Sequence, residues 1–407
     1  MVDLLICVKT FYAVLLFQDN KIAFSLSLPL HHKKIIVEVE SFKQLGVGES
    51  YIKALADLKI KKPSEIQQKA IPYLLQNKGD LIGQAPTGTG KTIAFGLPLL
   101  HSVSENKKGI QGLVLAPTRE LCQQIAKQLF KLTKYGPKIF TEAIYGGEKI
   151  EIQIANLKRP TQIVVATPGR LLDLIDRGAI DLSEVKTLIL DEADEMLSMG
   201  FKDELERVMD TIHRSSAKWL FSATIPLALQ SLITRFMNPG LHRISVSKNV
   251  EINTKIEHQF FICEQSQKFD YVYEFLKSQG SAKGIVFCRT RADTEVVARK
   301  LMGKHISADA LHGDLGQRDR DKVMRAFIKG RIKVLVATDI SARGVDVEDV
   351  AFVIHYQLPE QIESYTHRSG RTARAGKRGI SICFVDKYEL KIINQIEKTL
   401  KVNFIKI

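Results

Sequence analysis

Cysteine is scarce in this 407-residue chain: five occur, scattered along it and odd in number. No C-x-x-C pair is present, and no cysteine stands in a cluster with histidine. This excludes a disulfide framework and a zinc site, because either needs paired thiols or closely spaced ligands. Free cysteines are among the most buried side chains, so we expect core fillers in a protein of the reducing cytoplasm. The five are Cys7, Cys122, Cys263, Cys288 and Cys383.

Long uncharged apolar runs are also absent. A membrane span needs about 20 apolar residues with few charges. The nearest match, 2–17, is interrupted by Asp3 and Lys9. Its leading charge is negative, whereas a secretory signal begins with positive charge. We therefore interpret residues 1–40 as an N-terminal segment of unassigned role, either an added edge element or an upstream extension, and expect no membrane association.

Low-complexity tracts and short-period repeats are missing, and the composition is 45% hydrophobic and 26% charged. This ordinary composition excludes disordered and collagen-like proteins, and the length suits roughly two or three domains. Charge is unbalanced: 59 Lys and Arg stand against 45 Asp and Glu, a net charge of +14. Such a surplus favours a polyanionic partner, either a nucleic acid or an acidic membrane surface.

From residue 42 onward, short β-branched runs alternate with amphipathic stretches, which is typical of parallel sheets covered by helices on both faces. The predicted strands are 113–116, 163–166, 187–190, 218–221, 284–288, 333–337, 350–356 and 379–384, and the clearest helices are 120–133 and 203–213. A polar stretch at 245–254 interrupts the series. We therefore predict an α/β protein with domains at 41–246 and 257–407, joined by a short flexible linker at 247–256.

The segment 85–92, Ala-Pro-Thr-Gly-Thr-Gly-Lys-Thr, predicts a phosphate-binding loop. It follows the apolar pair Leu81-Ile82 and precedes a helical stretch. In that setting glycines let backbone N–H groups close around phosphate oxygens at a helix N-terminus. Lys91 would reach the β- and γ-phosphates, and the Thr92 hydroxyl would bind Mg²⁺.

A pair of carboxylates follows about a hundred residues later, where an apolar strand ends in Asp191 and Glu192. Ligands of open α/β sheets bind at the carboxyl ends of the strands. Asp191 would hold Mg²⁺, and Glu192 would orient and deprotonate the attacking water. Beside a phosphate loop, this interpretation is stronger than that of simple helix-capping acids.

Residues 191–194 read Asp-Glu-Ala-Asp, and with the phosphate loop the chain resembles a DEAD-box ATP-dependent RNA helicase. The resemblance runs from about residue 42 to the C-terminus and suits a minimal core of the bacterial or translation-initiation-factor-4A-like type. It implies two tandem RecA-like domains, ATP and Mg²⁺ as cofactors, and RNA-stimulated hydrolysis of ATP.

The resemblance implies a nucleotide site. Pro-Ser-Glu-Ile-Gln at 63–67 looks like the Q motif, in which the Gln67 amide would read the adenine edge, and Phe42 stands where an aromatic packs on the base. Lys59 is a departure, because the family usually has glycine there. The implied ATP-binding residues are Phe42, Ile60, Gln67, Ala85, Thr87, Gly88, Thr89, Gly90, Lys91, Thr92, Gly344 and Asp346.

Other segments match the family's RNA-contacting motifs, which grip the sugar-phosphate backbone without reading bases. The implied RNA-binding residues are Pro117, Thr118, Arg119, Gly147, Thr167, Arg170, Arg289, Thr290, Gln317, Arg320 and Thr338. The buried-strand setting of Trp219 predicts a core residue and not a base-stacking platform. We interpret His312 as a local hydrogen-bonding residue.

The last motif of the family matches residues 367–374. Arg371 and Arg374 lie three apart, so a helical turn would direct both toward the γ-phosphoryl group as arginine fingers. The implied catalytic set is Lys91, Asp191, Glu192, Arg371 and Arg374. The residues implied to couple hydrolysis to RNA separation are Asp194, Ser222, Thr224 and His367, with the hydroxyls bonding Asp191 or Asp194.

A site divided between two lobes predicts that ATP and RNA bind cooperatively, that closure bends one strand, and that short duplexes open locally. The alternatives are an ATP-gated RNA clamp with little unwinding, a DNA-directed motor of the same superfamily, and a membrane-surface protein. We expect a monomer with RNA as its partner, and ribosomal or RNA-decay proteins as possible companions.

Overall fold

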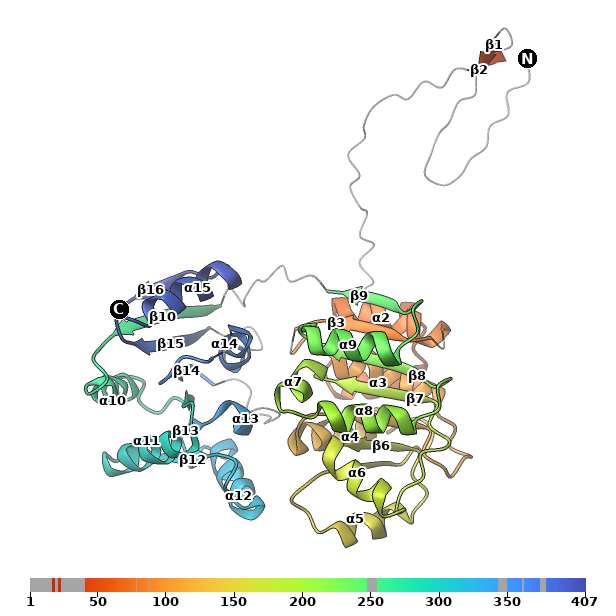
Figure 1. Ribbon diagram of the computed structural model, residues 1–407, viewed down its shortest axis with the longest axis horizontal. Helices are drawn as coiled ribbons and strands as arrows, with labels where there is room; N and C mark the ends of the chain where they lie inside the picture. The colour runs from red at the N-terminus through yellow and green to blue at the C-terminus, as the bar shows by residue number, and fades with distance from the viewer. Residues whose placement is uncertain are drawn as a thin grey trace. The chain divides into compact units, whose positions relative to one another are not determined.

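The computed structural model describes residues 41–77, 79–86, 88–246, 255–342, 350–360, 362–373 and 378–407, together with the backbone of two short N-terminal strands. These strands, β1 (Phe17–Gln18) and β2 (Lys21–Ile22), pair antiparallel. Residues Met1–Glu38 form one unit and Val39–Ile407 another. Within the second unit we call 41–246 the first lobe and 255–407 the second lobe (Figure 1).

The first lobe is built on a seven-stranded sheet with the order β5-β6-β4-β7-β8-β3-β9, in which every pair is parallel. The strands are β3 (Leu81–Gln84), β4 (Gly112–Leu115), β5 (Thr141–Ile144), β6 (Ile163–Ala166), β7 (Thr187–Asp191), β8 (Ala217–Ser222) and β9 (His242–Ser245).

Helices cover both faces of this sheet. They are η1 (Phe42–Leu45, a 3₁₀ helix), α1 (Glu49–Asp57), α2 (Glu65–Gln76), α3 (Lys91–Ser102), α4 (Arg119–Leu132), α5 (Ile150–Leu157), α6 (Pro168–Asp176), α7 (Ala193–Ser198), α8 (Lys202–Thr211) and α9 (Leu227–Phe236). Along β4, Val114 packs with α1–α4 on one face, while Leu113 and Leu115 pack with α6–α9 on the other. Burial on both faces explains the continuous apolar strands.

The second lobe repeats this plan with a parallel sheet of order β12-β13-β11-β14-β15-β10-β16. Its strands are β10 (Ile256–Ile262), β11 (Gly284–Phe287), β12 (Ala308–Leu311), β13 (Val334–Ala337), β14 (Phe352–His355), β15 (Gly379–Val385) and β16 (Phe404–Lys406). Its helices are α10 (Lys268–Ser278), α11 (Arg291–Gly303), α12 (Gln317–Ile328), α13 (Asp339–Ala342), α14 (Ile362–Ser369) and α15 (Leu390–Leu400). The predicted α/β class with two parallel-sheet domains is confirmed.

Several core predictions hold as well. Trp219 is buried in β8, and the four described cysteines are all buried and free; Cys7 lies outside the described residues. His312 is buried with Nε2 at 3.3 Å from Glu295 Oε1 of α11, while its Nδ1 has no hydrogen-bond partner among the described residues. Of the helices in the described ranges, none combines the length and apolar character needed to cross a membrane.

Candidate functional site

The loop after β3 forms the first part of the site at the carboxyl edge of the sheet. Gly88 and Gly90 have φ of +80° and +88°, so the loop uses backbone conformations that favour glycine. α3 begins at Lys91, whose side chain is buried and donates from Nζ to the Ala85 carbonyl oxygen at 3.1 Å. The loop therefore curls around the lysine, as the phosphate-loop prediction requires. Thr87 lies outside the described residues.

The start of α2 packs against this loop. Ser64 and Gln67 form a capping box, in which the Ser64 N–H donates to Gln67 Oε1 at 3.0 Å. Gln67 Nε2 donates to the Gly90 carbonyl oxygen at 3.0 Å, and Ser64 Oγ donates to the Thr89 carbonyl oxygen at 2.6 Å. A Cβ on Gly90 would lie 2.2 Å from Gln67 Nε2. Both ends of the Gln67 amide thus fix the shape of the loop.

Two further residues assigned to the nucleotide lie beside this helix. Phe42 is buried in η1 and belongs to the core that α1 and α2 share. Ile60 is half-buried and packs against the same core. Between them, Lys59 has φ of +60°. The turn that glycine usually makes therefore forms here with lysine in the left-handed conformation.

Asp191 ends β7, two strands from the loop in the order β7-β8-β3. Burial raises the pKa of its carboxyl group to about 7, against the opposing effect of the Lys91 ammonium group. Its Oδ1 also accepts a hydrogen bond from the Glu192 N–H at 3.0 Å. A buried carboxylate facing a buried ammonium group is a site prepared for charged ligands.

Glu192 caps the N-terminus of α7 with φ of +52° and ψ of +50°. A non-glycine residue in this region costs of order 1–3 kcal/mol. Such strain is concentrated at functional sites, where the surrounding structure imposes it. The strained backbone sets the direction in which the half-buried Glu192 side chain leaves the strand end.

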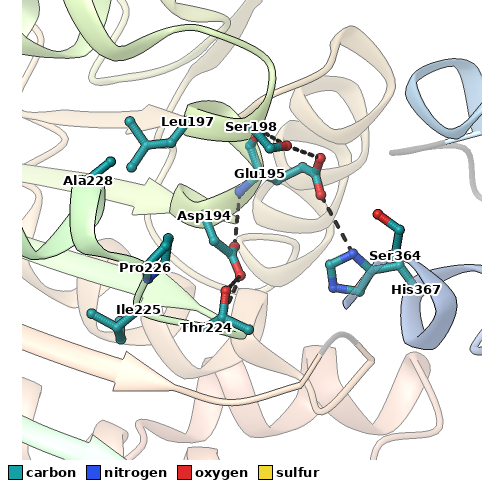
Figure 2. A pocket seen from close by; sticks show the side chains of 10 residues that line it. All are labelled: Asp194, Glu195, Leu197, Ser198, Thr224, Ile225, Pro226, Ala228, Ser364 and His367. Atoms are coloured by element: carbon teal, nitrogen blue, oxygen red, sulfur yellow. Dashed lines mark hydrogen bonds and ion pairs between the residues drawn. The ribbon is translucent and has the colours of Figure 1, made fainter. Parts of the chain in front are cut away.

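Asp194 connects α7 to the end of β8. Its Oδ2 accepts hydrogen bonds from the N–H and Oγ1 of Thr224, both at 2.8 Å, and its own N–H donates to Ser222 Oγ at 3.2 Å. Of the two carboxylates that the sequence offered as partners for these hydroxyls, Asp194 is the one that Thr224 bonds. The Ser222 hydroxyl bonds neither carboxylate, because it donates to the Thr224 carbonyl oxygen at 2.7 Å. Figure 2 shows Asp194 and Thr224 pointing toward one another.

Next to this pair is a cavity of about 610 Å³. Its lining includes Asp194 and Thr224 from the first lobe and Ser364 and His367 from α14. Figure 2 shows His367 directed at Glu195, with Nδ1 at 3.6 Å from Oε2. The structure thus places His367 near the residues predicted to couple hydrolysis to RNA separation.

The first-lobe residues assigned to RNA lie in the turns after β4, β5 and β6. Thr118 caps α4 and accepts from the Leu121 N–H, and Arg119 lies over the Tyr145 ring at 4.6 Å. Arg170 donates to the Glu148 carbonyl oxygen at 3.0 Å and to Gln153 Oε1 at 2.9 Å. The remaining three are Pro117, Gly147 and Thr167, of which Gly147 has φ of +86° and Thr167 caps α6.

The second-lobe residues assigned to RNA lie at the carboxyl ends of β11 and β13 and on α12. Arg289 donates to the Leu358 carbonyl oxygen at 3.3 Å, and Thr290 caps α11. Arg320 donates from Nε to Glu120 Oε1 at 2.6 Å. The buried Thr338 bonds through its N–H to Ser341 Oγ at 3.1 Å. Gln317 begins α12.

One geometric expectation was wrong. A helical turn was predicted to direct Arg371 and Arg374 together, but α14 ends at Ser369, and Arg371 lies in the turn after it. Gly370 follows the helix, and the Arg371 N–H donates to the Arg368 carbonyl oxygen at 3.1 Å. The predicted residues Arg374, Gly344 and Asp346 lie outside the described residues.

Sequence reasoning assigned no role to Arg368, the largest fully buried side chain of the described residues. Its Nε and NH2 donate to the two oxygens of Asp339 at 2.6 and 2.7 Å, and its NH1 donates to the Gln357 carbonyl oxygen at 2.8 Å. The guanidinium group also lies 5.1 Å from the Phe287 ring centre. Nothing in the sequence pairs Arg368 with a residue 29 positions away, although Arg368 stands in the motif at 367–374.

Comparisons with known proteins agree with this geometry. The chain matches the family model "DEAD/DEAH box helicase" over residues 64–232 and "Helicase conserved C-terminal domain" over 267–376. It is 43% identical over 362 residues to the ATP-dependent RNA helicase CshA of Listeria monocytogenes, covering 88% of this chain and 69% of the relative.

Solved structures of similar fold include Dbp5 of S. cerevisiae bound to RNA and ADP-BeF3, with a TM-score of 0.83 and 32% identity over 90% of this chain and 95% of that one. Another is a DEAD box protein from the hyperthermophile Methanococcus jannaschii, with a TM-score of 0.52 and 39% identity over 91% of this chain and 100% of that one. With the loop, the two carboxylates and both sheets in place, the chain belongs to the DEAD-box family of ATP-dependent RNA helicases.

Proposed function

We propose that the first lobe binds ATP at the loop 85–92 and that Glu192 activates the water that attacks the γ-phosphorus. The observation that carries this proposal is that Lys91 and Asp191 are both buried at the carboxyl edge of one parallel sheet, where the Lys91 charge opposes the rise that burial causes in the pKa of Asp191. Lys91 would neutralise the β- and γ-phosphates. Glu192 would accept the proton of the attacking water as the bond to the bridging oxygen of ADP breaks.

The residues present fit a magnesium ion. Mg²⁺ is usually held by one or two carboxylates together with substrate phosphates and water. Asp191 supplies a buried carboxylate, and Thr92, in the first turn of α3, supplies a hydroxyl group. When bound, the ion would neutralise charge on the phosphates. The buried Asp191 carboxylate would be favoured in its ionised form by that charge.

For the nucleotide itself, we propose that Gln67 reads the adenine edge near Phe42 and Ile60, which would select ATP. Arg371 would stabilise the negative charge that develops on the γ-phosphoryl group. Arg374, Gly344 and Asp346 complete the proposed site from the second lobe. The position of Gln67 supports a role beside the nucleotide, because Nε2 donates to the Gly90 carbonyl oxygen of the loop that would contact the phosphates.

For RNA, we propose backbone contacts with little sequence specificity, made by the strand-end residues of both lobes. Hydroxyls, backbone N–H groups and arginines grip phosphates and sugars without reading bases. ATP and RNA would each favour the closed arrangement of the lobes, so each would tighten the binding of the other. Closure would open a few base pairs, and Asp194, Ser222, Thr224 and His367 would couple that opening to hydrolysis.

The central test is the Glu192→Gln variant. We expect RNA-stimulated ATP hydrolysis to fall by about 10²-fold or more, whereas ATP-dependent RNA binding should remain. Glu184→Gln is a matched control, because Glu184 is exposed before β7, at the opposite end of that strand. Full hydrolysis by Glu192→Gln would contradict the assignment of the base.

A strand-displacement assay with ATP distinguishes a helicase that unwinds from an RNA clamp. We expect short duplexes to open. Stable RNA binding without strand displacement would favour the clamp. Comparing ATPase stimulation by RNA and by DNA of the same sequence tests the nucleic acid. We also propose a monomer, with ribosomal or RNA-decay proteins as companions. A reducing cytoplasm is proposed as its compartment, which the buried free thiols of the described residues support.

A further inference from the structure

Polar side chains lie beneath α14 in the second lobe, on a face of the sheet where apolar ones would be expected. His258 of β10 pairs in register with Ser381 of β15, and His355 follows on the neighbouring strand β14. All three are buried. Parallel strands covered on both faces are usually apolar, and a buried polar group is costly unless it is hydrogen-bonded. Three such groups on adjacent strands therefore call for a function.

These groups are bonded to one another and to the helix above them. Tyr365 and Ser369, four residues apart on one face of α14, are both buried. Ser381 Oγ is the hub: it lies 3.2 Å from the Tyr365 hydroxyl, 2.8 Å from Ser369 Oγ and 3.1 Å from His355 Nε2. The Tyr365 hydroxyl continues to His258 Nδ1 at 2.6 Å.

The network ends at the charged side chain of Arg368. His355 Nδ1 lies 3.5 Å from NH1 of Arg368, the arginine that is bonded to both oxygens of Asp339. A guanidinium group only donates hydrogen bonds, so His355 Nδ1 faces it as an acceptor. Its Nε2 then carries the proton and donates toward Ser381. Burial and the Arg368 charge lower the pKa of His355, which keeps the ring neutral.

The backbone of Arg371 is bonded to that of Arg368. The Arg371 N–H donates to the Arg368 carbonyl oxygen at 3.1 Å, and the Arg371 carbonyl oxygen accepts from the Val350 N–H at 3.4 Å. In the same turn, Thr372 N–H donates to the Ser369 carbonyl oxygen at 3.2 Å. A shift of α14 on the sheet would therefore move Arg371 with it.

We propose that His258, His355, Tyr365, Ser369 and Ser381, which we call the second-lobe polar network, are positioning residues that seat Arg368 and thereby aim Arg371 at the γ-phosphoryl group. This rests on the proposed role of Arg371. Hydrogen bonds are directional, so the contacts that meet at Ser381 and Tyr365 favour one position of α14 on the sheet. His258 Nε2, at the end of the network, is buried without a hydrogen-bond partner in the described part of the chain. Misplacement of a catalytic group by about 1 Å can cost about 10²-fold in rate.

Ser381→Ala tests the hub, because it removes a single oxygen. We expect the kcat for RNA-stimulated ATP hydrolysis to fall about tenfold while the KM for ATP changes less than about twofold, since Arg371 acts on the transition state. Ser216→Ala is the matched control: Ser216 is a buried serine bonded to the Val185 carbonyl oxygen in the first lobe. It should leave kcat unchanged, although it too loses a buried hydrogen bond.

A double-mutant cycle with Arg371→Ala decides between positioning and general destabilisation. If the network acts through Arg371, Ser381→Ala should cost nothing further in that background; multiplied losses would overturn the proposal. Tyr365→Phe repeats the test should Ser381→Ala fail to fold. If Ser381→Ala and Tyr365→Phe both keep a normal kcat while Arg371→Ala is inactive, the positioning role of the second-lobe polar network is refuted and the proposed role of Arg371 stands. Full activity of Arg371→Ala would instead refute the proposed role of that arginine.

Discussion

At Lys59 the backbone has φ of +60°, in the left-handed region that costs a side-chain-bearing residue of order 1–2 kcal/mol. Glycine removes this cost but also adds conformational freedom to the unfolded chain. That freedom lowers the free energy of unfolding by a few tenths to about 1 kcal/mol. We therefore expect Lys59→Gly to raise the free energy of unfolding by about 0.5–1 kcal/mol.

Urea unfolding monitored by the fluorescence of Trp219, which lies in the first-lobe core with α2, measures that change. Lys62→Gly is the control, because Lys62 is equally exposed and has no positive φ. It should be neutral or destabilising. A loss of stability in Lys59→Gly would show that the lysine side chain makes a contact worth more than the strain.

Gly90 is constrained in two ways, since φ is +88° and a Cβ would come within 2.2 Å of Gln67 Nε2. Gly90→Ala should therefore push the Gln67 amide off the loop and break its bond to the Gly90 carbonyl oxygen. We expect ATP affinity to fall about tenfold or more, the equivalent of one lost and one misplaced hydrogen bond.

Titration with a fluorescent ATP analogue measures this loss. Gly178→Ala is the matched control, since Gly178 also has a positive φ, +61°, but nothing within 4 Å of the added Cβ. It should lower stability slightly and leave ATP affinity intact. An equal loss of affinity in both variants would assign the effect to backbone strain and not to Gln67.

Among the secondary-structure elements, most inner strands were predicted, whereas the edge strands and the inner strands β3 and β10 were not. The predicted strand at 163–166 coincides with β6, because every residue there is buried and the sequence is continuously apolar. β9 reads His-Arg-Ile-Ser and buries only Ile244, so its pairing depends on β3 and not on its own pattern. Tertiary pairing overrides local preference at such edges.

The candidate site likewise has parts that the sequence predicted and parts that it did not. Motifs located the loop and the carboxylates because their chemistry is contiguous in sequence. The Arg368–Asp339 pair and the network at Ser381 depend on which strands are adjacent, and strand order is not written in any one segment. His258 is an example: the sequence predicted no strand over 256–262, yet the structure buries His258 in β10 against Tyr365.

The packing of β10 against α14 should make stability depend on pH. Burial lowers the pKa of His258 to about 4, below its ordinary value of 6.5, and His355 shifts in the same direction. The folded state therefore binds protons less readily than the unfolded state. Stability from these groups is fully present above about pH 6.5 and is lost as the pH falls. For His258 the loss continues toward pH 4 and amounts to about 2 kcal/mol between pH 6.5 and 5.

His258→Gln tests this, because the amide does not titrate and can still bond the Tyr365 hydroxyl group. We expect the denaturation midpoint of the second lobe to fall less steeply over pH 6.5–5 in the variant than in the unaltered chain. His213→Gln, at an exposed histidine, is the control and should leave the slope unchanged. Identical slopes for all three proteins would refute the assignment of the titration to His258.

At the scale of the whole molecule, the net charge of +14 is consistent with a polyanionic partner. The arginines assigned to RNA, however, are already bonded to or paired with protein groups. Arg119 lies 3.4 Å from Asp321 Oδ2, Arg170 lies 3.6 Å from Asp173 Oδ2, and Arg320 is bonded to Glu120. These carboxylates orient the guanidinium groups and reduce their net charge. Specific placement, and not the overall surplus, should therefore set RNA affinity.

RNA binding should then depend on salt through only a few phosphate contacts. If Arg119, Arg170, Arg289 and Arg320 each neutralise one phosphate of a single strand, the slope of log K against log salt should be about −3, at about −0.7 per contact. Affinity would fall about 50-fold between 50 and 200 mM KCl. Fluorescence anisotropy with labelled RNA, in the presence of ATP and the Glu192→Gln variant, measures the slope without turnover.

Single substitutions show which arginines contribute to this salt dependence. Arg170→Ala should make it shallower by about 0.7, whereas Arg207→Ala, at an exposed arginine paired with Asp176, should leave it unchanged. If the contacts are to the backbone, as proposed, oligomers of different sequence should give the same slope and similar affinity. A slope several times steeper would mean that the surface charge as a whole binds RNA, and a strong sequence preference would mean that bases are read.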